Sequence, residues 1–181
     1  ILQQELKKIL NGRFSQSEST RLNYSRGEDT YDPILSKAVV FPETNEEVSK
    51  ILKLCNEHKV PVVPFGTGTS LEGNVVGNDK GITISLEKMN QVLSVNTQDF
   101  DCRVQACVTR EQLNDYLRED GVFFPIDPGA NAAIGGMAST SASGTMAVKY
   151  GTMKTVITGL TVVLPNGCLL YTSPSPRDIG E

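Results

Sequence analysis

A glycine- and hydroxyl-rich segment directly after a β-branched run constrains the fold of this chain more than any other feature. Residues 60–63 read Val-Pro-Val-Val, and residues 64–73 hold three glycines and three Ser or Thr hydroxyls without any Lys or Arg. Glycine reaches positive φ without a Cβ clash, so consecutive backbone N–H groups can converge on one anion. The segment therefore predicts a loop at the end of a strand in which amide dipoles bind a diphosphate. The candidate residues are Gly66, Thr67, Gly68, Thr69 and Ser70.

Two better-known phosphate loops do not fit this segment. The dinucleotide motif G-x-G-x-x-G requires glycine where Leu71 stands, and no helical pattern begins there. The motif G-x-x-x-x-G-K-[ST] requires a lysine that the segment lacks. Taken alone, the loop fits a plain glycine-rich connection between two strands as well as it fits an anion-binding role.

The composition is that of an ordinary globular protein. The 181 residues are 39% hydrophobic and 21% charged, which suits one domain or two small subdomains that share a core. A net charge of -4 without any basic run argues against nucleic acid as a partner, and no apolar segment is long enough to span a bilayer. The cysteines form no C-x-x-C pair and no metal-site spacing, which predicts free thiols. We therefore expect a small-molecule partner.

Helical and extended patterns alternate through the first part of the chain. Apolar residues at helical spacing predict a helix over residues 2–10, and residues 38–41 read as a short strand. Thr44 with Glu47 three positions later forms a capping box that begins a second helix. The connection from residues 38–41 to the strand at 60–63 has the length of a crossover, so we expect these two strands to be parallel neighbours.

Shorter alternating segments follow and indicate a second, antiparallel part. Residues 82–86, 92–95 and 102–106 alternate apolar and polar side chains, which predicts small antiparallel strands. A second capping box and a glycine stop predict a helix over residues 109–121. Residues 122–125 read as another strand.

A second cluster of small residues lies between residues 127 and 151. It contains five glycines and few large side chains. Protein interiors are close-packed, so this much bare backbone needs something to fill the space beside it. A flat cofactor ring would fill that space. Tight packing of a helix against a strand is the competing explanation, and it would use only some of these glycines.

Taken in order, these segments resemble the FAD-binding (PCMH-type) half of the vanillyl-alcohol oxidase superfamily, and within it the D-lactate and D-2-hydroxyacid dehydrogenase branch. The resemblance extends over nearly the whole chain up to residue 167 and rests on residues 26–29, 40–64, 66–73, 105–113, 124–129 and 135–151. It implies an α+β fold in which a small parallel βαβ part and an antiparallel sheet part hold FAD between them. Ala106 and Cys107 depart from the family pattern of Pro or Ala followed by Gly.

The resemblance also implies a role for individual residues. Gly66, Thr67, Gly68, Thr69 and Ser70 would hold the FAD pyrophosphate. Pro128 and Gly129 would lie along the cofactor, with Ile134, Gly135 and Gly136 close by. Thr140, Ser141, Ser143 and Gly144 would border the flavin, supported by Tyr150, Gly151 and Ile157.

The implied activity is oxidation of a D-2-hydroxy acid, with D-lactate to pyruvate as the leading case and a cytochrome or quinone as electron acceptor. The catalytic base and the carboxylate clamp stay unknown. We expect them, with any divalent metal ligands, in a C-terminal half beyond this sequence, so the fragment alone should be inactive. The sole histidine, His58, reads as a surface residue, which favours non-covalent FAD. Arg103, Arg110 and Arg118 read as solvated side chains.

Two alternatives to this activity stay open. The same scaffold could serve D-2-hydroxyglutarate or glycolate oxidation, or a flavin-dependent ether-lipid synthase. A non-catalytic module that binds some other anion through the glycine loop is the second alternative.

The end of the chain departs from the pattern. Residues 162–167 read as a strand and an Asn-Gly turn that requires a returning strand, but residues 168–181 contain two prolines and resemble one reading frame of a sequencing-library adapter. We therefore expect an N-terminal helix and lead-in at 1–36, a FAD-binding PCMH-type domain at 37–167 and a non-native tail at 168–181, with a Ser/Pro linker as the alternative. The chain starts without Met, which leaves localisation open between the cytoplasm and the mitochondrial matrix or inner membrane.

Overall fold

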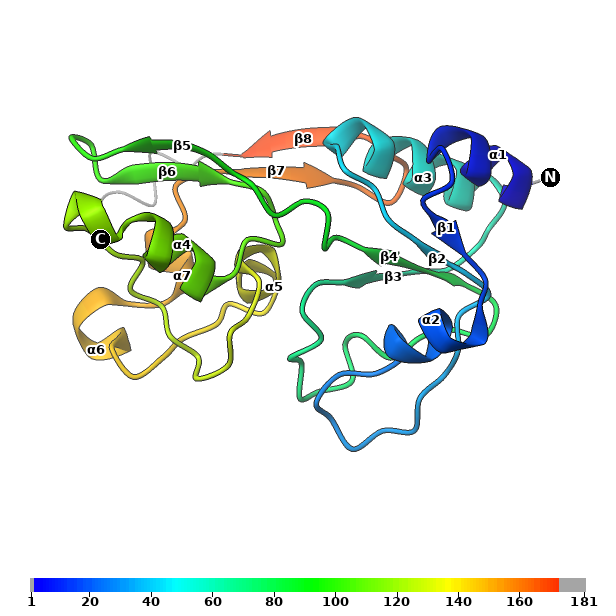
Figure 1. Ribbon diagram of the computed structural model, residues 1–181, viewed down its shortest axis with the longest axis horizontal. Helices are drawn as coiled ribbons and strands as arrows, with labels where there is room; N and C mark the ends of the chain where they lie inside the picture. The colour runs from blue at the N-terminus through cyan, green and yellow to red at the C-terminus, as the bar shows by residue number, and fades with distance from the viewer. Residues whose placement is uncertain (1, 173–181) are drawn as a thin grey trace.

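A four-stranded sheet organises the N-terminal lobe of the computed structural model, which describes residues 2–172 (Figure 1). Its strands are β1 (Phe14–Ser15), β2 (Val39–Val40), β3 (Val62–Phe65) and β4 (Ile82–Ser85), in the order β1-β2-β4-β3. β2, β4 and β3 run parallel, and β1 is an antiparallel edge strand. All four residues of β4 are buried, as expected for a parallel strand that is covered on both faces.

Two expectations for this sheet are wrong. β4 lies between β2 and β3, so the strands predicted over residues 38–41 and 60–63 are parallel but are not neighbours. Residues 82–86 contribute to this parallel sheet and not to the antiparallel part. Thr83, which produced the alternating pattern, is fully buried and donates a hydrogen bond of 2.8 Å to the Ser36 hydroxyl. Because its hydroxyl is hydrogen-bonded, Thr83 can be buried although it is polar, so the alternation of polar and apolar residues did not mean that one face of the strand is exposed.

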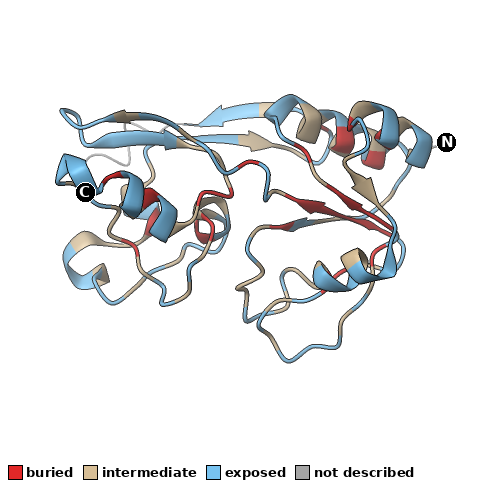
Figure 2. Ribbon diagram, viewed as in Figure 1, coloured by how far each residue is buried: buried red, intermediate tan, exposed pale blue. Residues whose placement is uncertain are grey.

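Two amphipathic helices cover the sheet on one side. α1 (Leu2–Ile9) and α3 (Asn45–Glu57) match the predicted helices, and their inward faces are among the buried parts of Figure 2. Thr44 is the N-cap of α3, because its hydroxyl accepts a hydrogen bond of 3.2 Å from the Glu47 N–H. The core between these helices and the sheet includes Leu6, Leu10, Val40, Ile51, Ile82 and Ile84.

α2 (Glu18–Asn23) lies on the other side of the sheet and was not predicted (Figure 1). Ser17 caps it, since the Ser17 hydroxyl accepts a hydrogen bond of 3.3 Å from the Thr20 N–H. The helix buries none of its residues, so it carries no apolar periodicity that a sequence pattern could show.

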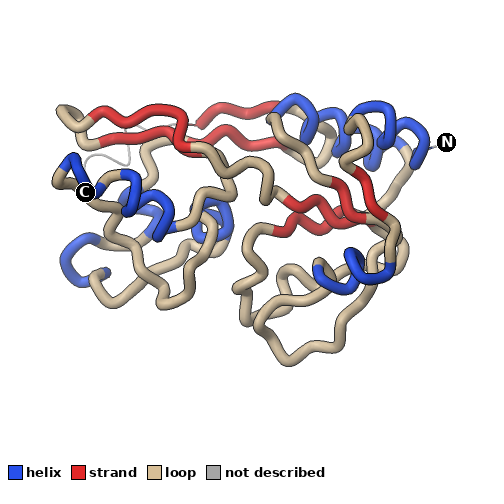
Figure 3. Tube along the Cα trace, viewed as in Figure 1, coloured by secondary structure: helices blue, strands red, loops and turns tan. Residues whose placement is uncertain are grey.

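The second lobe begins with the antiparallel part that the alternating segments predict (Figure 3). β5 (Val92–Asn96) and β6 (Asp101–Val104) form an antiparallel pair. α4 (Arg110–Tyr116) begins at its predicted threonine cap, and the 3-10 helix η1 (Arg118–Asp120) extends it to Gly121, where φ is +69°. The predicted helix and its left-handed glycine stop are therefore confirmed.

The strand predicted over residues 122–125 is absent from the part of the chain that the structure describes. The side chain of Asn114 takes the place of a neighbouring strand. The Phe124 N–H donates to Asn114 Oδ1 at 2.7 Å, and Asn114 Nδ2 donates to the Phe124 carbonyl at 3.3 Å. Val122 and Phe124 pack against the α4 core, whereas Phe123 is exposed, so the segment is half-buried without a sheet.

Three short helices form within the second small-residue cluster. They are α5 (Ile134–Ser139), α6 (Ala147–Tyr150) and α7 (Met153–Val156). Buried Met137 and Met153 pack with Ile126 in a separate small core. None of the three was predicted, because two glycines lower the helix propensity of α5, and α6 and α7 are only four residues long, too short for an apolar periodicity to show.

A final β-hairpin contacts the first lobe through its turn. β7 (Leu160–Val163) pairs antiparallel with β8 (Leu169–Thr172), so the Asn-Gly turn does have its returning strand. At the turn, the Ser49 hydroxyl of α3 donates a hydrogen bond to the Gly167 carbonyl, which brings the hairpin onto the first lobe. The non-native origin of residues 168–181 stays a prediction, and residues 173–181 lie outside the described part of the chain.

The predicted α+β class, with one parallel and one antiparallel part, is confirmed. Within residues 2–172, no helix combines the length and the apolar character needed to cross a bilayer. The four cysteines are free, as predicted, and burial raises the pKa of the Cys55 thiol to about 11.

An ion pair joins the edge of the sheet to the start of α3. The Arg13 guanidinium donates to both Glu47 carboxylate oxygens, at 2.7 and 2.5 Å, and to the Phe41 carbonyl at 3.0 Å. Both side chains of the pair are about four-fifths buried. The hydrogen bonds from Arg13 lower the pKa of Glu47, against the opposing effect of burial.

We expect Glu47→Gln to lower the free energy of unfolding by about 1 to 2 kcal/mol at neutral pH, because Arg13 loses its hydrogen-bonded carboxylate and keeps only the longer ion pair with Glu43, at 3.6 Å. A depressed folded pKa stabilises the protein above the unfolded pKa, so the difference should shrink as pH falls below about 4. Urea unfolding followed by circular dichroism at several pH values measures it. Glu46→Gln, in the same helical turn, is the control. Equal effects of the two variants would contradict the prediction.

Candidate cofactor site

A groove of about 2250 Å³ runs between the two lobes and takes residues from both glycine clusters. The first loop forms one wall, and the start of α5 with the turn before it forms the other (Figure 1). The predicted site residues that line it are Gly66, Thr67, Gly68, Thr69, Ser70, Pro128, Ile134, Gly135, Gly136, Thr140 and Ile157. Six others do not line it: Gly129, Ser141, Ser143, Gly144, Tyr150 and Gly151.

The two clusters meet at the end of β3. A Cβ atom placed on Gly66 would lie 3.3 Å from the Cβ of Ala133, the N-cap residue of α5. Ala133 is buried and forms an isolated antiparallel bridge with Thr109, which caps α4. Segments nearly 70 positions apart in the chain are thus side by side, as the two-cluster hypothesis requires.

The first loop presents a row of free amide donors. The backbone N–H groups of residues 67–71 donate to no other group within residues 2–172. Gly68 has a φ of +74°, and a Cβ there would lie 2.8 Å from the ring of Phe65. The turn therefore rests on an aromatic ring, and only glycine satisfies both the positive φ and the contact. Successive free amides on such a turn form a concave site for an anion.

The ring beneath the loop is itself held in place. Tyr24 packs edge to face on Phe65 with ring centroids 5.1 Å apart, and on Phe41 at 5.5 Å. The Tyr24 hydroxyl donates to the Glu87 carboxylate. Burial, and then the hydrogen bond to Glu87, raise the pKa of Tyr24 to about 12. The hydroxyl therefore stays protonated as a donor at neutral pH.

A short segment before the sheet braces the loop from outside. The Glu28 N–H donates to the Ser70 carbonyl at 3.0 Å, and a Cβ on Gly27 would lie 2.5 Å from the same oxygen. Asp29 accepts hydrogen bonds from the N–H groups of Gly27 and Tyr31, at 3.2 and 3.0 Å. Residues 26–29 belong to the segments that carry the family resemblance, but none of them was predicted to be a site residue. The glycine between charged neighbours and the aspartate two positions later were the available signal.

The glycines of the second cluster fall into two kinds. A Cβ on Gly144 would overlap the Asp127 carbonyl oxygen, and one on Gly135 would lie 2.9 Å from Ala106. These two allow close backbone packing, which is the competing explanation of the cluster. A Cβ on Gly136 would meet no atom within 4 Å, and Gly136 lines the groove. Gly136 therefore leaves open space on the groove wall.

The groove contains little positive charge near the loop. Glu28 and Glu72 line it, and Arg103 does so from β6. His58 is exposed at the C-cap of α3, as expected. Among residues 2–172, no group of three or more His, Cys, Asp or Glu side chains could hold a metal ion. Near the first loop, the donors available to an anion are backbone amides and hydroxyls.

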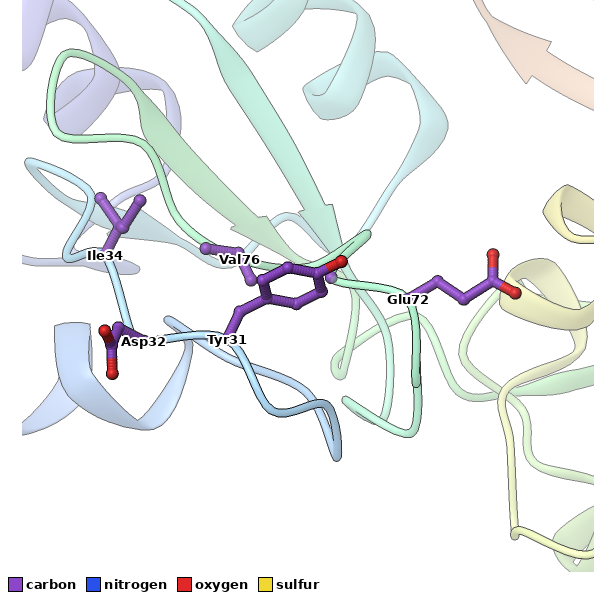
Figure 4. Close-up of a pocket in the computed structure, with 6 residues that line it drawn as sticks. Tyr31, Asp32, Ile34, Glu72 and Val76 are labelled. Atoms are coloured by element: carbon purple, nitrogen blue, oxygen red, sulfur yellow. The ribbon is translucent and has the colours of Figure 1, made fainter.

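A second, smaller pocket of about 350 Å³ lies behind the loop (Figure 4). The Tyr31 ring lies beside Val76, and a Cβ on Gly73 would lie 2.8 Å from that ring. The carboxylates of Asp32 and Glu72 point away from each other. This pocket thus lacks converging polar groups, and the large groove is the better binding site.

Comparison with known proteins identifies the class. The chain belongs to the FAD binding domain family, which matches residues 36–173. A protein of Danio rerio named "Probable D-lactate dehydrogenase, mitochondrial" is 46% identical over 163 residues, which cover 90% of this chain and 33% of that protein. The mitochondrial D-lactate dehydrogenase (cytochrome) of Arabidopsis thaliana is 41% identical over 175 residues, 96% of this chain and 31% of its own length. The chain therefore spans about a third of these relatives.

A solved structure shares the fold. An alkyldihydroxyacetonephosphate synthase superposes with a TM-score of 0.85 over 96% of this chain and 34% of its own, at 22% identity. The resemblance to the PCMH-type FAD-binding fold is thereby confirmed, and FAD is the cofactor of the family. The free amides and the open wall at Gly136 fit a dinucleotide with a flat ring.

We expect Gly68→Ala to weaken FAD binding, because a methyl group at positive φ would press on Phe65 and displace the amides. Gly121→Ala is the matched control, since Gly121 has a similar φ of +69° and lies outside the groove. Both changes should cost about 1 kcal/mol or more in stability. Flavin fluorescence titration of both variants tests the loop. Equal affinities would remove Gly68 from the site.

We expect Gly136→Leu to keep the fold and to exclude the cofactor. The new side chain would meet no protein atom at its Cβ, and leucine favours a helix more than glycine by about 1 kcal/mol. Unchanged or higher thermal stability, together with loss of flavin fluorescence quenching, is the expected result. Normal flavin affinity in the Gly136→Leu variant would show that α5 does not border the cofactor.

Proposed function

We propose that this chain is the FAD-binding part of a flavin-dependent dehydrogenase that oxidises a D-2-hydroxy acid, with D-lactate converted to pyruvate and electrons passed to a cytochrome or quinone. The observation that carries the proposal is the row of free amides at residues 67–71 beside the open wall of α5, in one groove. The names of the similar proteins support D-lactate as the substrate.

Residues of the first loop would hold the diphosphate of non-covalent FAD. The amides of residues 67–71 would donate to its oxygens, and the hydroxyls of Thr67, Thr69 and Ser70 offer further donors. The loop has no cation, so hydrogen-bond geometry would decide affinity.

The second cluster would hold the remainder of the cofactor. Pro128, Ile134, Gly135, Gly136, Thr140 and Ile157 would contact it from the groove wall. The six predicted residues that do not line the groove would support this wall without contacting the cofactor. When bound, FAD supplies the acceptor for the substrate hydride. We propose that the base and the carboxylate clamp belong to the part of the protein beyond this chain.

The names of the relatives also support a mitochondrial location. We propose that the complete protein acts in the mitochondrion, where a cytochrome or a quinone could accept its electrons.

Titration of the purified chain with FAD tests the proposal. We expect saturable quenching of flavin fluorescence at one FAD per chain, and complete release of the flavin on acid precipitation because the link is non-covalent. Inorganic pyrophosphate should compete weakly, since it fills only the first loop. If pyrophosphate binds as tightly as FAD and FAD fluorescence stays unchanged, the chain is an anion-binding module without a flavin.

The complete protein tests the substrate. Reduction of an artificial acceptor should be faster with D-lactate than with D-2-hydroxyglutarate or glycolate at equal concentration. A preference for either of the other acids would change the substrate assignment and leave FAD binding intact.

A further inference from the structure

Arg110 is the first residue of α4, and its side chain lies beside Asp127 at the start of the second cluster. Its backbone N–H donates to the Ala132 carbonyl at 3.2 Å, and its Nε lies 3.5 Å from Asp127 Oδ1. The side chain is only 21% exposed. Its Nε is buried and has no hydrogen-bond partner within residues 2–172. Two carboxylates face the guanidinium: Asp127 lies next to the buried Nε, and the more exposed Glu111 lies 3.6 Å from Nη2. Asp127 is therefore the carboxylate nearest the unpartnered donor.

Asp127 connects the pair to the groove wall. Its Oδ1 accepts a hydrogen bond of 3.0 Å from the Gly129 N–H, which closes a turn around Pro128. Its carbonyl oxygen lies against the bare backbone of Gly144. Pro128 lines the groove, whereas Asp127 and Gly129 do not. Any shift of Asp127 would therefore move Pro128 and the segment that packs at Gly144.

We propose that Arg110 is a positioning residue of the cofactor groove, acting through Asp127 to fix the turn at residues 127–130. The inference rests on the proposed binding of FAD. The guanidinium also balances the Asp127 carboxylate, which is 31% exposed and would otherwise stand unpaired close to an anionic cofactor. Sequence reasoning treated Arg110 as a solvated helix residue, and its burial changes that interpretation.

A neighbouring ion pair provides a matched control. Arg118 pairs with Asp115 three positions earlier, and both side chains are about 70% exposed. Within residues 2–172, neither side chain of this pair forms a hydrogen bond or ion pair with the 127–130 turn. Its removal should leave the groove unchanged.

The experiment compares Arg110→Met, Arg110→Lys, Asp127→Asn, the double variant Arg110→Met with Asp127→Asn, and the control Arg118→Met. FAD affinity is measured by fluorescence and the stability of the flavin-free protein by thermal unfolding. We expect Arg110→Met and Asp127→Asn each to weaken FAD binding by about tenfold, and the double variant to be no weaker than either. Arg110→Lys should lie between wild type and Arg110→Met. Arg118→Met should bind like wild type.

A merely structural role predicts a different outcome. The Arg110 and Asp127 variants would then lose thermal stability, and their FAD affinity measured well below the unfolding temperature would not change. Additive effects of the two single changes, or an equal loss in Arg118→Met, would also overturn the proposal. If Arg110→Met does not fold, Arg110→Lys and Asp127→Asn still decide it.

Hydrogen exchange separates this proposal from the proposed function. In the flavin-free protein, amides of residues 127–133 should exchange faster in Arg110→Met than in wild type, while Arg118→Met matches wild type. If wild type fails to bind FAD, the function is wrong and this exchange result alone decides whether Arg110 fixes the turn. Unchanged exchange would overturn the role of Arg110, even in a protein that binds FAD.

Discussion

The groove depends on one close approach between the lobes. Gly66 follows β3 and lies against Ala133 at the start of α5, where a Cβ on the glycine would be 3.3 Å from the alanine methyl. β3 leads directly into the amide loop, and Ala133 leads directly into the helix that forms the opposite wall. Larger side chains at this contact would separate both walls together, because packed interiors yield little. Gly66 and Ala133 are small because the two lobes must come close together at this contact.

The glycines of this protein have different physical roles, although they look alike in the sequence. Gly68 needs a positive φ above Phe65, and Gly144 needs room for the Asp127 carbonyl. Gly136 needs neither, since nothing in the protein would contact its Cβ. The first kind fixes a turn, the second permits packing, and the third leaves space for something other than protein. Both explanations of the second cluster therefore hold, at different positions within it.

Features that depend on neighbouring residues in the sequence predicted much of the fold, and the remainder depends on contacts between distant residues. The threonine caps of α3 and α4 and the stop at Gly121 depend on neighbouring residues only, so they could be found from the sequence. The order of the parallel strands could not be found from the sequence. Thr83 in the central strand is polar, and its burial depends on a hydrogen bond to Ser36, which is distant in the chain. Among the site residues, the first loop follows from its composition. The braces at Gly27 and Arg110 depend on partners far along the chain.

Binding an anion in this groove is a problem of placement more than of charge. The chain carries a net charge of -4, and Glu28 and Glu72 stand on the groove lining while the loop has no cation. Long-range electrostatics would therefore oppose the proposed diphosphate, and attraction would have to come from amides at hydrogen-bond distance. Such contacts weaken steeply when a donor is displaced or turned. The ring of Phe65 beneath the loop and the hydrogen bond from Glu28 to Ser70 hold the donors in place, so in the proposed site they would contribute to affinity without touching the ligand.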